Sequence, residues 1–454
     1  MTVRRAPGPK GHWLFGSLAD RRDRPLDFYT ENRDTYGDVV RWRIGPLLIH
    51  QLNHPDHAKH VLVDHADRFT KGRQIPKLRP LLGKGLLTNE GASWKKQRRL
   101  MQPAFHRERL VRLAEGMIAD TRRLLDRWTP LAERGEVVDV AAEMSALTME
   151  IVGRALFGAN LASDSSVIFD ALTASLEEAN VRLLQIVEVP LSIPTPGNRR
   201  FLKARARLDA IVYRVIAERR AGKTEGTDLL KMLVEARDDE DSGSSMDDTQ
   251  LRDEVMTLFL AGHETTANAL AWTFHLLAAH PEIDAKMRAE IATVLGERSP
   301  SPEDVPKLAY TTRVFEESMR LYPPAWLIAR ATRFDEEFGG YTIPKGTMVG
   351  VAPYAIHRHP KFWPDPTRFD PDRFLPERAE GRPRYAYLPF GGGQRLCIGI
   401  HFAMMEAVII LAMVAQRVRL ASVPGHPVVP LAQVTLRPKY GIKMTLSPAA
   451  NGSL

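Results

Sequence analysis

The sequence of 454 residues contains a single cysteine, Cys397. One cysteine cannot form an internal disulfide, which excludes a disulfide-stabilised framework and favours a reducing cytosol. No segment reaches the ~18 consecutive apolar residues of a membrane-spanning helix, and the longest apolar run, VIILAMVA at 408–415, suits a buried helix. The N-terminal MTVRRAPGPKGHW lacks the apolar segment of a signal peptide. We therefore predict a cytoplasmic protein without a transmembrane anchor.

Repeats and low-complexity segments are also absent, and the overall composition is ordinary. Apolar residues make up 44% of the chain and charged residues 26%, as in soluble globular proteins. The length alone would allow two or three domains. The formal net charge of +8 is compatible with nucleic acid, an anionic membrane surface or an acidic protein partner, and charge by itself does not choose among them.

The centre of the chain is predicted to be helical. Helical patterns dominate from about residue 55 to 295, broken by a proline-rich stretch at 187–200 and an acidic loop at 235–248. Directly after that loop, a long helix is predicted from Asp248 to Ala279, with Asp247 or Asp248 as its N-cap. Its length of about 45 Å would cross a whole domain. It favours one domain over 1–454, with an irregular N-terminal segment at 1–15 and a flexible tail at 448–454.

Short strands are predicted on both sides of this helical region. Residues 38–52 are typical of two strands around Gly45-Pro46. A helix at about 308–321 is followed by a strand at 327–334 and a hairpin-like segment at 340–353. After an irregular segment at 354–396, a helix is expected at about 398–418 and strands at 428–446. The predicted fold class is mainly α with a smaller β part.

The stretch FGGGQRLCIG, residues 390–399, surrounds the cysteine. A lone cysteine is usually a small buried apolar residue, but here three glycines let the backbone approach a neighbour closely. Cys397 lies at the start of a predicted helix and near Arg395, and both features favour a thiolate. A nucleophilic role would need a histidine base, and no local nucleophile signature is present; zinc would need more Cys or His nearby. A haem iron needs only one protein ligand.

Four motifs together resemble the cytochrome P-450 superfamily. FGGGQRLCIG matches its haem-binding pattern F-x-x-G-x-R-x-C-x-G, and AGHETT (261–266), EESMR (316–320) and FDPDRF (369–374) follow the family's order along the chain. The resemblance implies the family's fold, with a long central helix over the haem. It also implies haem b as the cofactor, with the Cys397 thiolate as axial ligand of the iron.

The resemblance also implies which residues bind the haem. Trp94 and Arg98 match the family's W-x-x-x-R and would bind one propionate, while Arg330 and Arg395 match its other arginine positions. The rigid fork of arginine suits carboxylates. The full set of predicted cofactor-binding residues is Cys397, Trp94, Arg98, Ala261, Arg330, Pro389, Phe390, Gly391, Arg395, Ile398, Gly399 and Ala403.

In the long helix, Ala261 and Thr265 are four residues apart and share a face. Small Ala261 and Gly262 would leave room beside a flat cofactor. By the resemblance, Thr265 and Glu264 are the catalytic pair that relays protons to bound dioxygen; in an anonymous helix they would be a packing threonine and a solvated glutamate. The sequence His263-Glu264 begins a zinc-protease H-E-x-x-H pattern, but residue 267 is alanine, so we reject that site.

The EESMR and FDPDRF motifs predict a structural ion network. Glu317 and Arg320 can pair on one helix face, and the resemblance adds Arg373 and places the group in the interior, where it would hold the segment that presents the cysteine. Ala325, Trp326 and Leu327 are predicted to line the substrate pocket, completed by loop 74–87 and by residues near 187–200 and 434–436. IHRHP at 356–360 is expected to be an ordinary loop.

The resemblance implies a monooxygenase that uses dioxygen to hydroxylate or epoxidise an apolar small molecule, such as a lipid or terpenoid. No reductase module is expected in the chain, so electrons would come from a separate acidic ferredoxin or flavodoxin with its reductase. Lys95, Lys96 and Arg99 would form the basic patch that attracts it, and no nucleic acid partner is expected. The alternatives are a peroxide-driven or isomerising haem-thiolate enzyme, a non-catalytic haem-binding sensor and, remotely, a cysteine hydrolase.

Overall fold

The computed structural model describes residues 4–158, 171, 174–175, 178, 181–182, 189–222, 228–238, 240 and 243–449. The chain divides into two compact units, each assembled from segments distant in sequence. Unit 1 comprises Met1–Arg73, Thr312–Ile398 and Val429–Lys439, and unit 2 comprises Gln74–Thr311, Gly399–Val428 and Tyr440–Leu454. The single domain expected over 1–454 stays a prediction.

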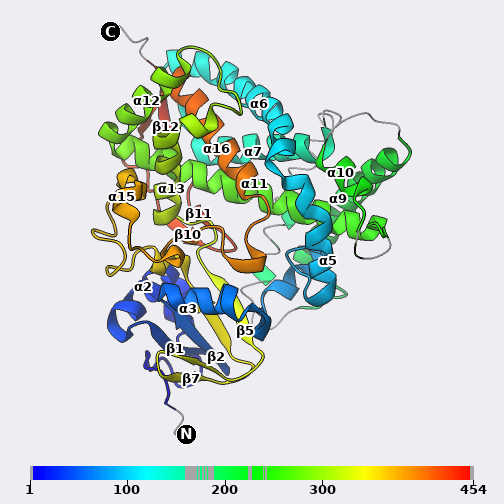
Figure 1. Cartoon of the computed structure of the whole chain (residues 1–454), viewed down its shortest axis with the longest axis vertical. Coiled ribbons are helices and arrows are strands. Elements are labelled where there is room, and N and C mark those ends of the chain that lie inside the picture. Colours follow the sequence, from blue (N-terminus) through cyan, green and yellow to red (C-terminus); the bar gives the residue numbers. More distant parts are fainter. Residues whose placement is uncertain are drawn as a thin grey trace. The chain divides into compact units, whose positions relative to one another are not determined.

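Unit 1 contains most of the β-structure (Figure 1). Its helices are short apart from α2 and the C-terminal part of α13. The elements are α1 (Leu18–Asp23), α2 (Pro25–Tyr36), β1 (Val39–Ile44), β2 (Leu47–Leu52), α3 (Pro55–Lys59), η1 (His60–Asp64), η2 (Ala66–Arg68), β3 (Phe69–Lys71), α13 (Ala309–Leu321), β5 (Ile328–Thr332), β6 (Glu336–Phe338), β7 (Tyr341–Ile343), β8 (Met348–Val351), α14 (Pro353–Ile356), η7 (Pro371–Phe374), α15 (Pro376–Ala379), η8 (Arg384–Ala386), η9 (Gly393–Arg395), β10 (Pro430–Ala432) and β11 (Leu436–Pro438).

The main sheet of unit 1 has five strands in the order β1-β2-β8-β5-β3. The predicted β1–β2 pair is confirmed: the strands are antiparallel, and Ile44 pairs with Leu47 across the Gly45-Pro46 turn. The hairpin predicted at 340–353 is wrong. Its two strands form, but β7 pairs with β6, while β8 pairs with β2 and β5. The distant strand β2 occupies one edge of β8 and β5 the other, so the two strands of the predicted hairpin do not pair with each other.

Unit 2 is mostly helical (Figure 1). Its elements are η3 (Ile75–Leu78), α4 (Arg79–Leu82), α5 (Gly91–Met101), η4 (Gln102–Phe105), α6 (Arg107–Glu133), β4 (Val137–Asp139), α7 (Val140–Phe157), α9 (Pro196–Arg220), α10 (Leu229–Glu235), α11 (Asp248–Ala279), α12 (Pro281–Leu295), η6 (Val305–Lys307), α16 (Ile400–Arg417), β9 (Val418–Ser422) and β12 (Lys443–Pro448). The mainly α fold class is confirmed.

The long helix α11 has the predicted limits, and most of its residues are buried. The Asp247 carboxylate accepts the backbone N–H of Gln250 at 2.7 Å, which satisfies one of the free donors of the first turn and confirms the predicted cap. Among the described helices, α16 is long and apolar enough to cross a membrane, but 67% of its apolar window is buried, as in a core helix.

The ends of the predicted irregular segments fall close to expectation. Residues 189–195 are irregular, and α9 begins at Pro196 behind the N-cap Thr195; positions 187–188 of the proline-rich stretch lie outside the described residues. Residues 4–15 carry no helix or strand beyond a single bridge at His12. The last strand, β12, reaches Pro448, and positions 450–454 of the predicted tail lie outside the described part of the chain.

Candidate functional site

The cysteine loop of unit 1 is a tight backbone turn that presents an exposed sulfur. The backbone N–H of Cys397 donates to the carbonyl of Phe390 at 3.0 Å, which closes the loop, and the Cys397 side chain is exposed. Helix α16 begins only at Ile400, with Gly399 as its N-cap. The helix expected from about residue 398, with Cys397 at its start, therefore begins two residues later, because Ile398 and Gly399 form a further turn between the cysteine and the helix.

Backbone conformation and close packing against neighbouring segments together account for the three glycines of the loop. Gly391 and Gly393 have φ angles of 75° and 66°, a region that favours glycine. A Cβ on Gly393 would lie 1.9 Å from the carbonyl oxygen of Leu62 in η1, and one on Gly392 would lie 2.6 Å from the ring of Tyr385. The predicted close approach is real, and its described partners at these two positions are protein atoms of unit 1.

Glu317, Arg320 and Arg373 meet in the interior of unit 1. Arg320 forks onto Glu317, with Nε–Oε2 and Nη2–Oε1 distances of 2.7 and 2.8 Å, and Arg373 Nε lies 3.3 Å from Oε1. The exposed fractions of the three side chains are 0, 0 and 4%. The guanidinium of Arg320 also donates to three backbone carbonyls, those of His357, Pro366 and Arg368. The network thus fixes the irregular chain that precedes the cysteine loop.

His357 is a buried positioning residue that the sequence analysis missed. Its Nε2 accepts the backbone N–H of Leu388 at 2.9 Å, and its Nδ1 lies 3.2 Å from the carbonyl oxygen of Arg320. Burial, reinforced by the charge of Arg320, lowers the pKa of His357 to about 3, so the ring is neutral. The IHRHP loop was expected to be ordinary; only its distant partners reveal this role.

A second tether reaches the same segment from α13. The hydroxyl of Tyr387 donates to the backbone carbonyl of Glu316 at 2.9 Å, and burial raises the pKa of the Tyr387 phenol well above its ordinary value. Tyr387 is therefore bonded directly to α13, and Leu388 is bonded to His357, whose own backbone carbonyl accepts from Arg320 of α13. The next residues, buried Pro389 and half-buried Phe390, begin the cysteine loop.

In unit 2, the middle of α11 contains a short accessible stretch. Ala261 is exposed, Glu264 and Thr265 are half-buried, and the residues on either side are buried. The Thr265 hydroxyl donates to the carbonyl of Ala261 at 2.7 Å, so the two residues share one face as predicted. A Cβ on Gly262 would lie 2.8 Å from Cγ2 of Val152 in α7. The role expected for Gly262 beside a cofactor is therefore corrected: it permits close packing of two helices.

His263 points into the same helix interface. Its Nε2 lies 3.2 Å from the hydroxyl of Ser145 in α7, and burial lowers its pKa to about 4. A neutral, buried imidazole bonded to a neighbouring helix holds the two helices together. Within the described residues, no cluster of three or more His, Cys, Asp or Glu could hold a metal ion.

The loop predicted to border the substrate pocket is anchored to the first half of α11. Asp253 Oδ2 accepts the backbone N–H of Lys84 at 2.7 Å, and Glu254 Oε2 accepts that of Leu86 at 2.8 Å. A Cβ on Gly85 would lie 2.1 Å from the hydroxyl of Thr257, so the loop lies directly on the helix. Two buried carboxylates therefore set the position of residues 84–86 relative to α11.

The remaining predicted cofactor residues differ in exposure. In unit 2, Trp94 is buried and Arg98 is half-buried, one turn apart on α5. Ala403 on α16 and its N-cap Gly399 are half-buried in the same unit. In unit 1, Arg330 on β5, Arg395 at the end of η9, and Gly391 and Ile398 in the cysteine loop are half-buried. Apart from buried Trp94, these positions are accessible enough for a ligand, and the role of all of them toward the haem stays a prediction.

Trp326 differs from its predicted role as pocket lining. It is 3% exposed and packs edge-on against Tyr29 in the core of unit 1, with its indole N–H donating to the carbonyl of Gln433 at 2.9 Å. The tryptophan is thus a core residue, since its ring has an apolar neighbour and its polar atom has a partner. Ala325 and Leu327 beside it are half-buried, and their pocket role stays a prediction.

The predicted basic patch is smaller than its sequence suggests. Arg99 binds Asp238 through Nη2–Oδ2 and Nε–Oδ1 at 2.7 and 2.9 Å, and its Nη1 lies 2.6 Å from Glu240. The guanidinium lowers the pKa of the Asp238 carboxyl. Lys95 is exposed and Lys96 half-buried. The acidic loop after α10 therefore compensates the charge of Arg99.

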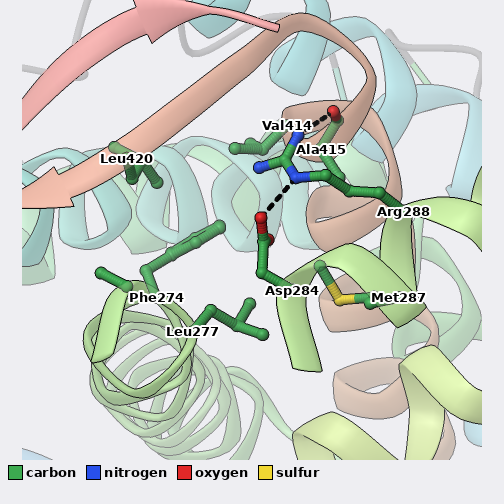
Figure 2. A pocket seen from close by; sticks show the side chains of 9 residues that line it. Phe274, Leu277, Asp284, Met287, Arg288, Val414, Ala415 and Leu420 are labelled. Atoms are coloured by element: carbon green, nitrogen blue, oxygen red, sulfur yellow. Dashed lines mark hydrogen bonds and ion pairs between the residues drawn. The ribbon is translucent and has the colours of Figure 1, made fainter. Parts of the chain in front are cut away.

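A small pocket lies elsewhere in unit 2, between the end of α11, α12, α16 and β9 (Figure 2). Arg288 crosses it, bonded to Asp284 at 2.6 Å and to the backbone carbonyl of Ala415. No predicted site residue lines this pocket. Arg288 there satisfies a carbonyl in the last turn of α16, which is a structural role.

The residues present fit a haem with a single protein ligand. The exposed Cys397 sulfur on a rigid loop can bind an iron that porphyrin already holds by four nitrogens. The exposed Ala261, with the Thr265 hydroxyl on the same face, gives α11 an accessible patch with one polar group.

Comparison with known proteins identifies relatives along nearly the whole chain. The family model described as "Cytochrome P450" matches residues 6–446. "Cyclooctatin synthase" of Streptomyces melanosporofaciens is 41% identical over 95% of this chain and 94% of that protein. "Pentalenene oxygenase" of Streptomyces avermitilis is 34% identical over 94% of both chains. The crystal structure of the "cytochrome P450DA heme domain" superposes with a TM-score of 0.89 at 27% identity, covering 99% of this chain and 98% of that one.

Proposed function

Because this chain belongs to the cytochrome P450 family, we propose that it hydroxylates or epoxidises an unsaturated, terpenoid-like small molecule. It is an oxidoreductase and a monooxygenase, with haem b as cofactor and a cysteine thiolate as axial ligand. The haem, when bound, supplies dioxygen activation. The exposed Cys397 on its closed loop is the observation that carries the assignment to this chain, because the sequence contains no other cysteine.

The proposed roles of the protein residues follow from their positions. Cys397 would hold the iron, and the bonds of His357 and Tyr387 hold the start of its loop. Thr265, whose hydroxyl donates to the Ala261 carbonyl, would hold a proton for the oxygen chemistry that the haem supplies, and Glu264 would replenish it. A hydroxyl that rests on a backbone carbonyl can reorient toward a ligand without breaking the helix.

The substrate class rests on the relatives. One of them, "Cyclooctat-9-en-7-ol 5-monooxygenase" of Streptomyces melanosporofaciens, is 40% identical over 88% of this chain and 86% of that protein. The substrate in its name is a cyclic, unsaturated alcohol, and the name "pentalenene oxygenase" also denotes an alkene. A molecule of this kind, bound mainly by apolar contacts, is the proposed substrate here.

The family also requires dioxygen and a redox partner. We propose that electrons come from an acidic ferredoxin or flavodoxin with its reductase in the cytoplasm. The net charge of +8 and the exposed Lys95 favour an acidic partner. Because Arg99 is bound to Asp238, its substitution is expected to affect this encounter less than that of Lys95.

The first experiment is an absorption spectrum of the purified, reduced protein after exposure to carbon monoxide. A strongly red-shifted Soret band that is lost in Cys397→Ala supports the thiolate ligand. Haem with an unshifted band, or folded protein unable to take up haem, contradicts the proposal. Turnover of cyclic alkenes with a ferredoxin and reductase then tests the substrate class, whereas activity with peroxide alone would favour a peroxide-driven enzyme.

A further inference from the structure

The N-terminal part of unit 1 contains an exposed apolar tip. Trp13, Leu14 and Phe15 are consecutive, and their exposed fractions are 77, 48 and 53%. Scattered exposed apolar residues are normal on a protein surface, but three adjacent large side chains are not. They occupy one short turn, residues 12–16, which is closed by two backbone hydrogen bonds of 2.8 Å between His12 and Gly16. This 12–16 turn belongs to none of the elements that the proposed function uses.

The 12–16 turn is fixed to the sheet of unit 1. The backbone N–H of Gly45, in the β1–β2 turn, donates to the carbonyl of Phe15 at 3.0 Å, and that of Ser17 donates to the carbonyl of Arg43 at 2.8 Å. A Cβ on Gly16 would lie 2.2 Å from the Arg43 carbonyl oxygen, so the turn lies directly against β1. The exposure of the three apolar side chains is therefore imposed by a defined backbone.

Most backbone polar groups of the turn are satisfied internally. The amides of Leu14 and Phe15 donate to Nδ1 of His12 at 3.2 and 3.3 Å, and the guanidinium of Arg43 donates to the carbonyls of His12 and Trp13. The ring of His12 also stacks on Phe15, with centroids 5.2 Å apart. Apolar side chains that project from a backbone with satisfied polar groups suit a medium poor in water.

The stretch of chain that contains the turn is rich in positive charge. Residues 4–24 contain six Arg or Lys and two Asp. Arg5 and Lys10 are exposed, and neither forms an ion pair within the described residues. Arg22 and Arg24, on the same stretch, are exposed but paired with Asp23 and Glu31. A basic stretch with a Trp-Leu-Phe tip is the combination that binds the interface of an anionic bilayer.

We propose that the 12–16 turn inserts into the headgroup region of anionic phospholipid membranes and attaches the protein to them reversibly. Tryptophan and phenylalanine favour this interface, and the nearby Arg and Lys side chains bind the lipid phosphates. A folded protein partner fits less well, because a stable interface takes about 20–30 residues a side, whereas this is a convex turn of five. An apolar substrate partitions into the same membrane, so attachment raises its local concentration.

Vesicle sedimentation of the full-length holoprotein tests the proposal. Binding to phosphatidylcholine vesicles containing about one third phosphatidylglycerol should exceed binding to pure phosphatidylcholine at least about tenfold and weaken with added salt. The variant Trp13→Ser/Leu14→Ser/Phe15→Ser should lose at least about tenfold of the partition coefficient. Phe334→Ser is the matched control, since Phe334 is 52% exposed but isolated on the same unit, and it should bind as the unaltered protein does.

Two further measurements keep the test independent of folding defects. Arg5→Gln/Lys10→Gln should weaken binding about 25-fold, because each basic residue near the surface contributes a factor of about five. Trp13→Phe should remove the blue shift of tryptophan emission that anionic vesicles produce. Equal binding by the triple variant, equal binding to neutral vesicles, or no binding to either vesicle would overturn the proposal. None of these readouts requires turnover, so the proposed enzymatic function is tested separately.

Discussion

The imidazole of His357 connects two segments that are far apart in sequence: it accepts the backbone N–H of Leu388 at 2.9 Å, and its other nitrogen lies 3.2 Å from the carbonyl oxygen of Arg320. Arg320 belongs to the buried ion network, and Leu388 immediately precedes the cysteine loop. The neutral ring of His357 therefore fixes the segment before the Cys397 loop relative to the end of α13. This arrangement parallels the hydrogen bonds that orient metal ligands in other proteins.

Replacing this ring should destabilise the protein and loosen the loop. His357→Phe keeps the volume but leaves the Leu388 N–H and the Arg320 carbonyl buried without a partner, at about 1–3 kcal/mol each. We expect the free energy of unfolding to decrease by about 2–4 kcal/mol and the haem content of the purified protein to decrease as well. Urea unfolding followed by haem absorbance measures both. His359→Phe is the control, because the ring nitrogens of His359 bind groups at the surface, the 40% exposed Asp38 and the exposed backbone N–H of Lys361, and their loss should cost at most about 1 kcal/mol.

The same residue should make the protein sensitive to acid. The pKa of His357 is lowered to about 3 by burial, whereas in the unfolded chain it has its ordinary value near 6.5. The unfolded state therefore binds a proton on this residue that the folded state does not bind. The free energy of unfolding decreases as the pH drops from 6.5 toward 3, by up to about 1.4 kcal/mol per pH unit. The stability difference between the unaltered protein and His357→Phe should shrink over this range. A difference that stays constant with pH would contradict the buried neutral ring.

Adjacent glutamates on α13 should respond in opposite ways to the same substitution. Glu317→Gln removes the carboxylate between two buried guanidinium groups, those of Arg320 and Arg373, and should cost about 3–5 kcal/mol. Glu316→Gln should instead stabilise the protein at pH 6, by up to about 2 kcal/mol, because burial raises the pKa of Glu316 to about 7, whereas the unfolded chain has already released this proton above its ordinary value near 4.5. Unfolding curves of the two variants at pH 6 provide the comparison. Equal losses would mean that the network does not stabilise the fold.

A buried carboxyl in unit 2 should reduce stability at high pH. Glu406 on α16 is 0% exposed, and burial raises its pKa well above the ordinary value, opposed by the hydroxyl of Thr266. As the pH rises above the unfolded value near 4.5, the unfolded chain releases a proton that the folded protein keeps, so stability decreases by up to about 1.4 kcal/mol per unit. Glu406→Gln should match the unaltered protein at pH 4.5 and be more stable at pH 7. Thermal unfolding at both pH values measures this, and no gain at pH 7 would show that the carboxyl ionises in place.

The proposed proton relay predicts a loss of coupling. Thr265→Ala should keep consuming electrons and dioxygen, while substrate oxygenation falls at least about tenfold and hydrogen peroxide appears, because the hydroxyl no longer delivers a proton. The control is Thr273→Ala. Thr273 donates the same bond to a carbonyl four residues earlier at 2.7 Å, but its side chain is fully buried. If both variants keep full coupling, Thr265 has only the structural role of Thr273.

Features that depend on neighbouring residues were predictable from the sequence. The limits of α11 follow from an Asp247 cap and a proline two residues past Ala279, and the β1–β2 pair follows from alternating residues around a Gly-Pro turn. The cysteine loop was recognised because glycine, arginine and cysteine stand at fixed short spacings. In each case, the deciding interactions join residues a few positions apart, within the reach of backbone geometry and local hydrogen bonds.

Only the tertiary structure decided the features that depend on distant segments. Strand β8 takes β2 and β5 as neighbours, Gly262 meets Val152 of another helix, and Trp326 enters the core instead of a pocket. His357 has no local signature at all, because its partners are 31 and 37 residues away. The sequence by itself thus determined the cysteine loop, the main helices and the family. The folded chain determined which neutral ring, which glycine and which carboxyl hold these parts in place, because burial and hydrogen-bond partners exist only once distant segments have packed.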